Sequence, residues 1–421
     1  MTTEQGAKRT SILIKLQRAA IVLNLGLALS YPVLWVIAWT QDLIWKVDFI
    51  GFYTGWSMVR DGLRAQLYNL AVQAPYQQHL LGGRSFSDGL LPYNYPPHTA
   101  VLLLPLAWVS LSHAFWLWTM AQGILLIRLL LLLRQLSSGW QSHERWLLLT
   151  ATVAFPPLFW NFLLGHFSLW LLVCLLQIYW TLKQGREGLA GLWLALGTLK
   201  PQAPFLLVGI LLLAAKRWRA LASAGLIGCG LVVFSSIMLG WGIWIDFLRM
   251  MRMTASSFGI FGINPTSMYN FKGALALILG NNQGVLINWI CGVALIATIL
   301  LTFGIWRGQW QPSAPTFELR MALTLLLGVL FSPHLNPPDA SMLIAPAALF
   351  YAYLHQRQLP SVTYVTFLMY CPIAFLDIHN LIGRRIGTRI PILVLIILTI
   401  WVSLTFNSER RRNAPPTCSP Q

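Results

Sequence analysis

The chain has 421 residues, of which 57% are hydrophobic and only 10% are charged. An ordinary soluble domain carries roughly 25% charged residues, so this composition excludes a soluble protein. Apolar runs recur from end to end, and most are long enough to cross the hydrocarbon core of a bilayer as helices. Because backbone groups in lipid must be paired within the protein, these runs predict an all-α polytopic membrane protein.

The formal net charge is +17, and the basic residues lie mostly at the ends of the apolar runs. Basic residues in such places set the orientation of membrane helices, so they predict topology and not nucleic-acid binding. The five cysteines are scattered along the chain, and no pair of them has the spacing of metal ligands. We expect them to act as small hydrophobic side chains.

The first apolar run is preceded by Lys8, Arg9, Lys15 and Arg18. By the positive-inside rule the N-terminus is therefore cytoplasmic, and the later basic clusters continue the alternation. About 12–13 transmembrane helices follow from this assignment, provided that the run 97–110 dips into the membrane and returns or lies along its surface. The expected spans are 19–41, 114–134, 146–161, 167–182, 189–199, 202–215, 220–241, 284–306, 319–332, 340–355, 360–376 and 390–406.

This topology places the long loops on the extracytoplasmic side of the cell membrane, be it an inner or a plasma membrane. No internal repeat and no soluble domain is recognisable, so residues 1–406 are expected to form one transmembrane domain. Residues 407–421 are expected to form a disordered cytoplasmic tail. The expected outer loops are 42–96, 242–283, 333–339 and 377–389.

Asp48 follows the first expected span almost directly, at the outer membrane surface and beside Phe49 and Phe52. Apolar surroundings remove water from a carboxylate, which raises its pKa and suits it to act as a general base. The alternative is a carboxylate with a purely structural role. Asp48 is therefore the first candidate for a catalytic residue.

The stretch from Tyr53 to Leu67 has the pattern of an amphipathic helix at the membrane surface. Arg60 and Arg64 are four residues apart, so both would point the same way, toward lipid phosphates. We therefore expect interfacial helices in the first extracytoplasmic loop.

The apolar stretch from Leu189 to Ala215 is interrupted by Lys200 and Pro201. Each half has about a dozen residues, too few to span a bilayer comfortably. Broken helices at membrane depth are tolerated where they line a polar cavity, and a buried lysine there marks a candidate functional site. An ammonium in this place suits a phosphate diester. The alternative is a lysine whose charged end reaches out of the membrane at the tip of a hairpin.

Two histidines occupy expected outer turns, His166 in the sequence LGHFS and His334 in the sequence SPHLNPPD. A histidine in a turn is usually an ordinary polar loop residue. Together with Asp48 and Lys200 on the same side of the membrane, however, the two form a candidate site. The chain has neither zinc-ligand spacing nor a phosphate-binding glycine loop, so no metal is predicted.

Several motifs follow one another in a recognisable order. They are the region of Asp48, the sequence DGLRAQLY at 61–68, YNYPP at 93–97, the lysine–proline hairpin at Lys200 and the turn SPHLNPPD at 332–339. This set resembles the membrane glycosyltransferases of family 87 over roughly residues 45–350. These are C-type enzymes, similar to the polyprenyl-phosphate-mannose-dependent mannosyltransferases that build phosphatidylinositol mannosides. His166 stands where the family often has glutamine.

The resemblance implies a C-type fold and the transfer of mannose or another hexose from a polyprenyl-phosphate donor, with inversion. The implied partners are membrane lipid, the polyprenyl-phosphate sugar and an extracytoplasmic glycolipid or glycan acceptor, and not nucleic acid. The leaving phosphate is already a good anion, so it needs positive charge and hydrogen-bond donors, and no cofactor is implied. The implied site residues are Asp48 as the general base; Lys200, His334 and Arg60 for the donor phosphate; and Tyr53, Tyr95, His166, Asn336 and Asp339 for the substrates.

Two other functions stay open at this point. A secondary transporter or flippase of lipid-linked sugars would also use a broken hairpin with a buried charge. Against it, no inverted repeat is visible, and the polar residues collect in outer loops instead of at mid-membrane. A polymerase or ligase of lipid-linked glycans is chemically close to the first interpretation.

The charge distribution predicts that Asp48, His166, His334 and Asp339 share the extracytoplasmic side of the membrane. Single-cysteine variants at these positions should react with a membrane-impermeant thiol reagent in intact cells. Labelling of position 48 or 334 only after permeabilisation would disprove this topology.

Overall fold

The computed structural model of the chain describes residues 3–40, 47–86, 90–256, 264–308, 310–358 and 384–412. Within these residues all regular secondary structure is helical, as expected from the apolar runs. Six of the helices in this part of the chain are long and apolar enough to cross a membrane. The protein is therefore an all-α polytopic membrane protein.

Within the described residues each expected span contains one helix or two consecutive helices, and the span 360–376 lies outside these residues. The expected span 146–161 is divided into two helices at Phe155, and the helices at 168–183, 187–199 and 203–214 are shorter than the six that are long enough to cross a membrane. The run 97–110 forms the short α4 and η3. In the first half of the chain the helices are α1 (Thr3–Thr40), α2 (Phe49–Arg60), η2 (Arg64–Gln66), α3 (Leu70–Leu80), α4 (Pro97–Leu102), η3 (Leu104–Trp108), α5 (Leu111–Leu136), α6 (Ser142–Ala154), α7 (Pro156–Leu164), α8 (Ser168–Lys183), α9 (Glu187–Leu196), η4 (Gly197–Leu199) and α10 (Ala203–Ala214).

The second half continues the bundle with two further long apolar helices after α11. Its helices are α11 (Trp218–Leu239), α12 (Ile243–Ser256), η5 (Pro265–Ser267), α13 (Phe271–Leu279), η6 (Asn281–Gln283), α14 (Gly284–Trp306), α15 (Thr316–Leu330), η7 (Pro337–Leu343), α16 (Ile344–Gln356) and α19 (Arg384–Arg412).

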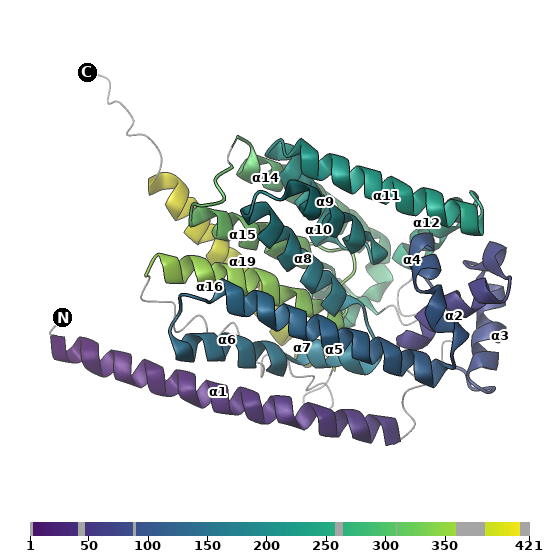
Figure 1. Cartoon of the computed structure of the whole chain (residues 1–421), viewed down its shortest axis with the longest axis horizontal. Helices are drawn as coiled ribbons and strands as arrows, with labels where there is room; N and C mark the ends of the chain where they lie inside the picture. The colour runs from purple at the N-terminus through teal and green to yellow at the C-terminus, as the bar shows by residue number, and fades with distance from the viewer. Residues whose placement is uncertain are drawn as a thin grey trace.

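The centre of the bundle is formed by α8, α15 and α16, whose side chains are almost all buried. By contrast α1, α11 and α14 bury only a small part of their apolar surface. Figure 1 shows α1 and α11 along two opposite edges of the bundle. An apolar helix with such an exposed surface is stable where hydrocarbon surrounds it, which fits a position facing lipid.

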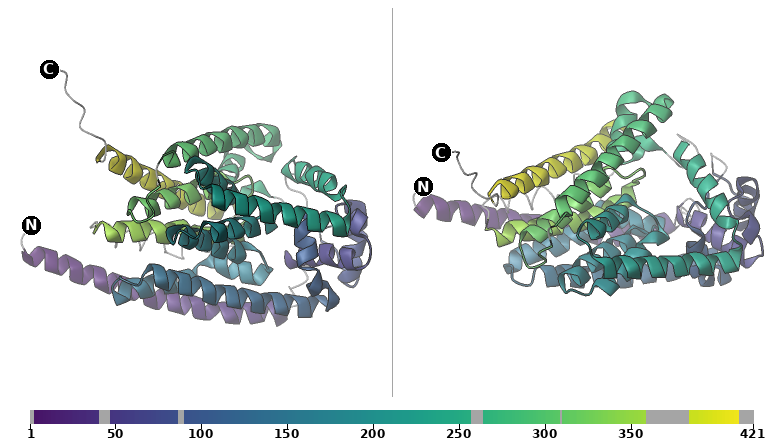
Figure 2. Two further views of the ribbon diagram at one scale, coloured as in Figure 1. Left: turned by 45° about the horizontal axis from the view of Figure 1, so that its top comes forward. Right: turned by 90° about the horizontal axis from the view of Figure 1, so that it is seen from above.

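A second compact unit, made of α2, α3, α4 and η3, lies at one end of the bundle (Figures 1 and 2). Helix α2 is buried from Phe49 to Met58. The prediction of an amphipathic surface helix starting at Tyr53 is therefore wrong, because aromatic side chains of the neighbouring segments cover it. The packing is tightest at Gly55, where an added Cβ would lie 2.3 Å from the ring of Tyr93.

The predicted break at Lys200 is present between η4 and α10. Lys200 has extended backbone angles, φ −136° and ψ 95°, as expected for a residue that precedes a proline. The carbonyl groups freed by the break are not left unpaired. Thr99 donates to one of them at 2.7 Å, and the His98 ring contacts another at 3.2 Å, so α4 supports the break.

The opposite end of the bundle carries acidic side chains paired with basic ones. The buried Glu318 accepts a hydrogen bond from Tyr179 at 2.9 Å and pairs with Lys183 at the end of α8. Glu409 pairs with Arg357 at 2.7 Å, and this contact holds the last turns of α19. Residues 407–412, expected to be disordered, are therefore helical, and the rest of the expected tail lies outside the described residues.

Helix α19 also begins earlier than expected. It starts at Arg384, so the arginines at 384, 385 and 389, assigned to an outer loop from the sequence, belong to this helix. Apolar runs predict the hydrocarbon-spanning part of a helix, and helices commonly extend beyond that part into the polar layers. The charges at both ends of α19 mark these extensions.

Replacing Gly191 by alanine should lower the stability of the bundle. An added Cβ at this position would lie 2.3 Å from the carbonyl oxygen of Ala220, where α9 packs against α11. Such overpacking typically costs about 1–3 kcal/mol of the free energy of unfolding. Thermal unfolding of the detergent-solubilised protein measures the effect. Gly188→Ala in the same helix is the control, because a Cβ there meets nothing within 4 Å; equal midpoints for both variants would contradict the prediction.

Candidate active site

Four segments far apart in the sequence meet near the unit formed by α2, α3 and α4. They are the residue before α2, the turn between α7 and α8, the break before α10, and η7. They carry Asp48, His166, Lys200 and Asp339, respectively. The Lys200 ammonium nitrogen lies 3.0 Å from His166 Nε2 and 2.6 Å from Asp339 Oδ1. The fold thus brings together four residues that the sequence singled out.

The turn that carries His166 depends on a glycine. Gly165 ends α7 in the left-handed region, with φ 66°, and an added Cβ would lie 2.9 Å from Phe49 Cβ. Only glycine combines this conformation with so close an approach to α2. The Gly165 carbonyl also accepts a hydrogen bond from Trp118 at 2.9 Å. These contacts hold His166 next to the start of α2, where Asp48 lies.

The ion pair of Lys200 and Asp339 is buried, with side-chain exposures of 8% and 0%. Ser168 also donates to Asp339 Oδ1 at 2.7 Å, and the Asn336 backbone N–H donates to Oδ2 at 3.2 Å. Burial by itself would raise the pKa of Asp339, but the Lys200 ammonium and these donors hold it below its usual range. Asp339 is therefore a permanent carboxylate and not a proton acceptor.

The hydrogen bonds around His166 define its tautomer. Ser168 Oγ donates its proton to Asp339, so it accepts from His166 Nδ1–H, which lies 2.7 Å away. His166 Nε2 then has a free lone pair and accepts from the Lys200 ammonium. Burial and the nearby Lys200 lower the pKa of His166 to about 3, so the ring stays neutral. The assignment follows from this network of donors and acceptors.

Asp48 differs from Asp339 in both solvent exposure and pKa. Its Oδ2 lies 3.9 Å from His166 Nε2, and its side chain is 36% exposed. Loss of solvation raises the pKa of Asp48 to about 6; the Lys200 ammonium opposes this shift and the Asp339 carboxylate adds to it. Asp48 is thus accessible to a substrate and close to a cation, and it changes its protonation state near neutral pH.

The turn before η7 places His334 and Asn336 beside this group. The carbonyl of His334 accepts a hydrogen bond from Ser332 at 2.9 Å, and Asn270 donates to the Ser332 carbonyl at 2.7 Å. Burial lowers the pKa of His334 to about 4, and the charges of Asp339, Lys200 and Lys272 also act on it. His334 is therefore a neutral ring within electrostatic range of the Lys200–Asp339 pair.

Lys272 was not singled out from the sequence. It lies in α13 and is only 5% exposed, and its charge acts on His334. In the sequence it sits in a long expected loop, where a lysine is normally solvated, so no local pattern marked it. Its burial depends on the packing of α13 against α14. Ser168, which links His166 to Asp339, likewise has no local signal of its role.

The remaining predicted residues divide into two groups. The Tyr95 ring packs on Phe52 with centroids 4.6 Å apart. Burial raises the pKa of Tyr95 well above its usual value, and the charges of Asp339 and Asp48 raise it further. Tyr53 instead donates to the Val109 carbonyl at 2.6 Å, which ties α2 to η3.

Arg60 lies at the far end of α2 from Asp48, about 18 Å away along the helix axis. Its guanidinium pairs with Asp61 at 2.6 Å and also contacts the carbonyl of Ala107. The structure therefore brings Tyr95, His334 and Asn336 to the group of Asp48, His166, Lys200 and Asp339, but it does not bring Arg60 there.

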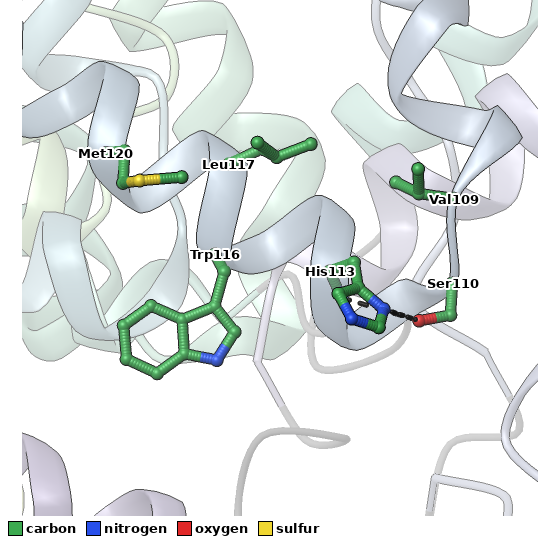
Figure 3. Close-up of a pocket in the computed structure, with 6 residues that line it drawn as sticks. All are labelled: Val109, Ser110, His113, Trp116, Leu117 and Met120. Atoms are coloured by element: carbon green, nitrogen blue, oxygen red, sulfur yellow. Dashed lines mark hydrogen bonds between the residues drawn. The ribbon is translucent and has the colours of Figure 1, made fainter.

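A separate pocket of about 440 Å³ opens at the start of α5 (Figure 3). Figure 3 shows the His113 ring bonded to Ser110 and the Trp116 indole beside it, and the rest of the lining is apolar. The lining of this pocket includes His113 but no carboxylate and no lysine. The group around Asp48, with two carboxylates and a lysine, is therefore the candidate active site.

The arrangement around Asp48 suits the deprotonation of a hydroxyl group next to an anionic leaving group. Asp48 is a carboxylate that a substrate can reach, the Lys200 ammonium supplies positive charge, and a neutral histidine ring can supply a hydrogen-bond donor. In the part of the chain that the structure describes, no three His, Cys, Asp or Glu side chains are grouped as metal ligands.

A family model for glycosyltransferase family 87 matches residues 93–333, more than half of the chain. The chain therefore belongs to this family. It matches no curated protein and no solved structure. The matched segment contains His166 and Lys200, whereas Asp48 and Asp339 lie outside it and reach these residues only through the fold.

Removing one partner of the Lys200–Asp339 pair should be strongly destabilising, because it leaves the other charge buried and uncompensated. Lys200→Met and Asp339→Asn are each expected to cost about 3–5 kcal/mol of the free energy of unfolding. The double variant K200M/D339N removes both charges of the pair and should recover most of this loss. Denaturant unfolding in detergent measures the three values. Losses that simply add in the double variant would show that the two side chains do not stabilise each other.

Proposed function

We propose that this member of glycosyltransferase family 87 is a polyprenyl-phosphate-sugar-dependent hexosyltransferase of the C type. It transfers mannose or another hexose to an extracytoplasmic lipid or glycan acceptor in the cell membrane. The observation that carries the proposal is the partly exposed Asp48 carboxylate beside the buried Lys200–Asp339 pair. Family membership supports sugar transfer in general, and the donor, the acceptor and the role of Asp48 are the proposed part.

In the proposed reaction the acceptor hydroxyl oxygen attacks the anomeric carbon of the donor sugar. A new carbon–oxygen bond forms on one face of the sugar while the bond to the phosphate oxygen breaks on the other, which inverts the configuration. Asp48 takes the proton of the acceptor hydroxyl. Its pKa of about 6 leaves it ionised at neutral pH and basic enough to accept that proton.

The leaving group is a polyprenyl phosphate, which carries away the electron pair of the broken bond. Lys200 has three N–H donors, and contacts with His166 and Asp339 use two of them. We assign the third to a phosphate oxygen, with the neutral ring of His334 as a second donor. The Lys272 charge adds a favourable potential at the same place. Because Arg60 is held by Asp61, it is not included in this phosphate site.

The other residues of the group position these reactive side chains. Asp339 and Ser168 orient His166 and Lys200 through their hydrogen bonds. We assign Tyr95 and Asn336, which belong to the same group, to contacts with the sugar or the acceptor. No cofactor and no metal is assigned a role, because the acceptor proton goes to Asp48 and the leaving anion to Lys200.

Asp48→Asn is the sharpest test of the proposed function. The amide keeps the shape of the side chain but removes the basic oxygen, so folding should survive while sugar transfer falls by about 10²–10⁴-fold. The assay measures transfer of labelled hexose from a panel of polyprenyl-phosphate sugars to membrane lipid extracts in proteoliposomes. Asp61→Asn is the matched control, because Asp61 is an exposed carboxylate of the same unit that pairs with Arg60.

Two outcomes would overturn the proposal. A loss of less than tenfold in Asp48→Asn would remove Asp48 from the role of base. Movement of an unchanged sugar or lipid across the bilayer, with no new glycosidic product from any donor, would favour the transporter or flippase.

The pH dependence offers a further prediction. Asp48 acts as a base only when it is ionised, and its pKa is raised to about 6. The rate of transfer should therefore be constant above this pH and fall about tenfold per pH unit below it. Rates measured in proteoliposomes buffered alike on both sides test this profile. The residual activity of Asp48→Asn should not fall in this way below pH 6. The same fall in both proteins would show that the titrating group is not Asp48.

A further inference from the structure

Helix α12 begins where a membrane span ends. Helix α11 has 22 residues, is almost entirely apolar and buries little of its surface inside the protein. Gly240 follows it with φ 97°, and the first residue of α12 is Ile243. Such a tight turn leaves α12 no room to move away from the end of α11. It therefore starts at the boundary between hydrocarbon and headgroups.

The two faces of α12 differ in both burial and chemistry. Ile243, Phe247 and Met250 form its inner face and are buried. Its outer face follows helical spacing of three and four residues. This outer face consists of Ile245, Leu248, Arg249 and Arg252, all of them exposed, with Leu248 at 64%.

The inner face binds α12 firmly to the rest of the protein. Trp244 donates to Ser236 Oγ in α11 at 3.1 Å, and its ring lies 5.8 Å from the ring of His98 in α4. The Phe247 ring packs on Tyr68 with centroids 5.6 Å apart. Figure 1 shows α12 next to the end of α11 and to α4. Its orientation is therefore fixed by the protein, and the outer face points away from it.

We infer that the outer face of α12 binds the headgroup layer of an anionic phospholipid bilayer. In this arrangement Ile245 and Leu248 enter the boundary between headgroups and acyl chains, while the arginines contact lipid phosphates. Long basic side chains beside apolar ones suit this layer, since their charged ends can reach toward the headgroups. The exposed Trp241 in the turn has the same preference for the interface.

The charges favour an anionic surface over a neutral one. Arg249 pairs with Asp246 at 3.0 Å, but both side chains are exposed, and exposed pairs at this spacing are weak. Arg249 is therefore able to exchange this partner for a lipid phosphate. Arg64, exposed and bonded to the Met238 carbonyl at 3.0 Å, adds a positive charge near the same turn. Basic residues close to an anionic leaflet are attracted to it.

The experiment places a polarity-sensitive fluorophore on Leu248→Cys in a background whose five native cysteines are replaced by alanine. The labelled protein is reconstituted into nanodiscs of phosphatidylcholine alone or mixed with phosphatidylglycerol. In the anionic discs we expect a blue shift of the emission and a several-fold loss of quenching by acrylamide. No sugar transfer is measured, so the result is independent of the proposed function.

Two charge variants of the labelled protein complete the test. R249Q/R252Q should abolish the difference between the two kinds of nanodisc, whereas R219Q, which removes an exposed arginine at the other end of α11, should preserve it. Equal shifts in neutral and anionic discs, or an unaffected R249Q/R252Q, would overturn the inference.

Discussion

The buried ion pair of Lys200 and Asp339 is the interaction on which the rest of the site depends. An ammonium and a carboxylate taken out of water each carry a large solvation cost, which is offset only by good geometry and by further hydrogen bonds. Here the Asp339 carboxylate receives hydrogen bonds from Lys200, Ser168 and the Asn336 backbone. These hydrogen bonds to one carboxylate connect the hairpin break, the α7–α8 turn and η7, so they fix the three segments relative to one another.

The same pair gives the carboxylates of Asp339 and Asp48 different pKa values. Asp339 is held ionised by its partners, whereas Asp48, at the accessible edge of the group, has a pKa raised to about 6. Two titratable groups whose environments push their pKa values apart are a common basis for separate catalytic and structural roles. His166, neutral and hydrogen-bonded through both ring nitrogens, lies between them and separates the two negative charges.

The scaffold around the site is built from two kinds of packing. Apolar helices with a buried centre form the bundle, and ion pairs such as Lys183 with Glu318 connect helices at the far end. The unit of α2, α3 and α4 is instead an aromatic core, with Trp56 and Phe49 buried in it. Rigid aromatic contacts suit the proposed role of Asp48 in particular, because they hold the start of α2 and with it Asp48 in one position.

Hydropathy and local chemistry alone determined the helical membrane class, the positions of the long apolar helices and the break at Lys200, because each depends on neighbouring residues and on the solvation of the backbone. They also pointed to Asp48, His166, His334 and Asp339 as polar residues in outer turns. Only the tertiary structure decided which of these meet. The fold pairs Lys200 with Asp339, which is 139 positions away in the sequence. It also buries α2 and places Lys272 within range of the site, whereas Arg60 pairs with Asp61 away from the site. Contacts between distant segments depend on how helices pack, and no local pattern of residues encodes that packing.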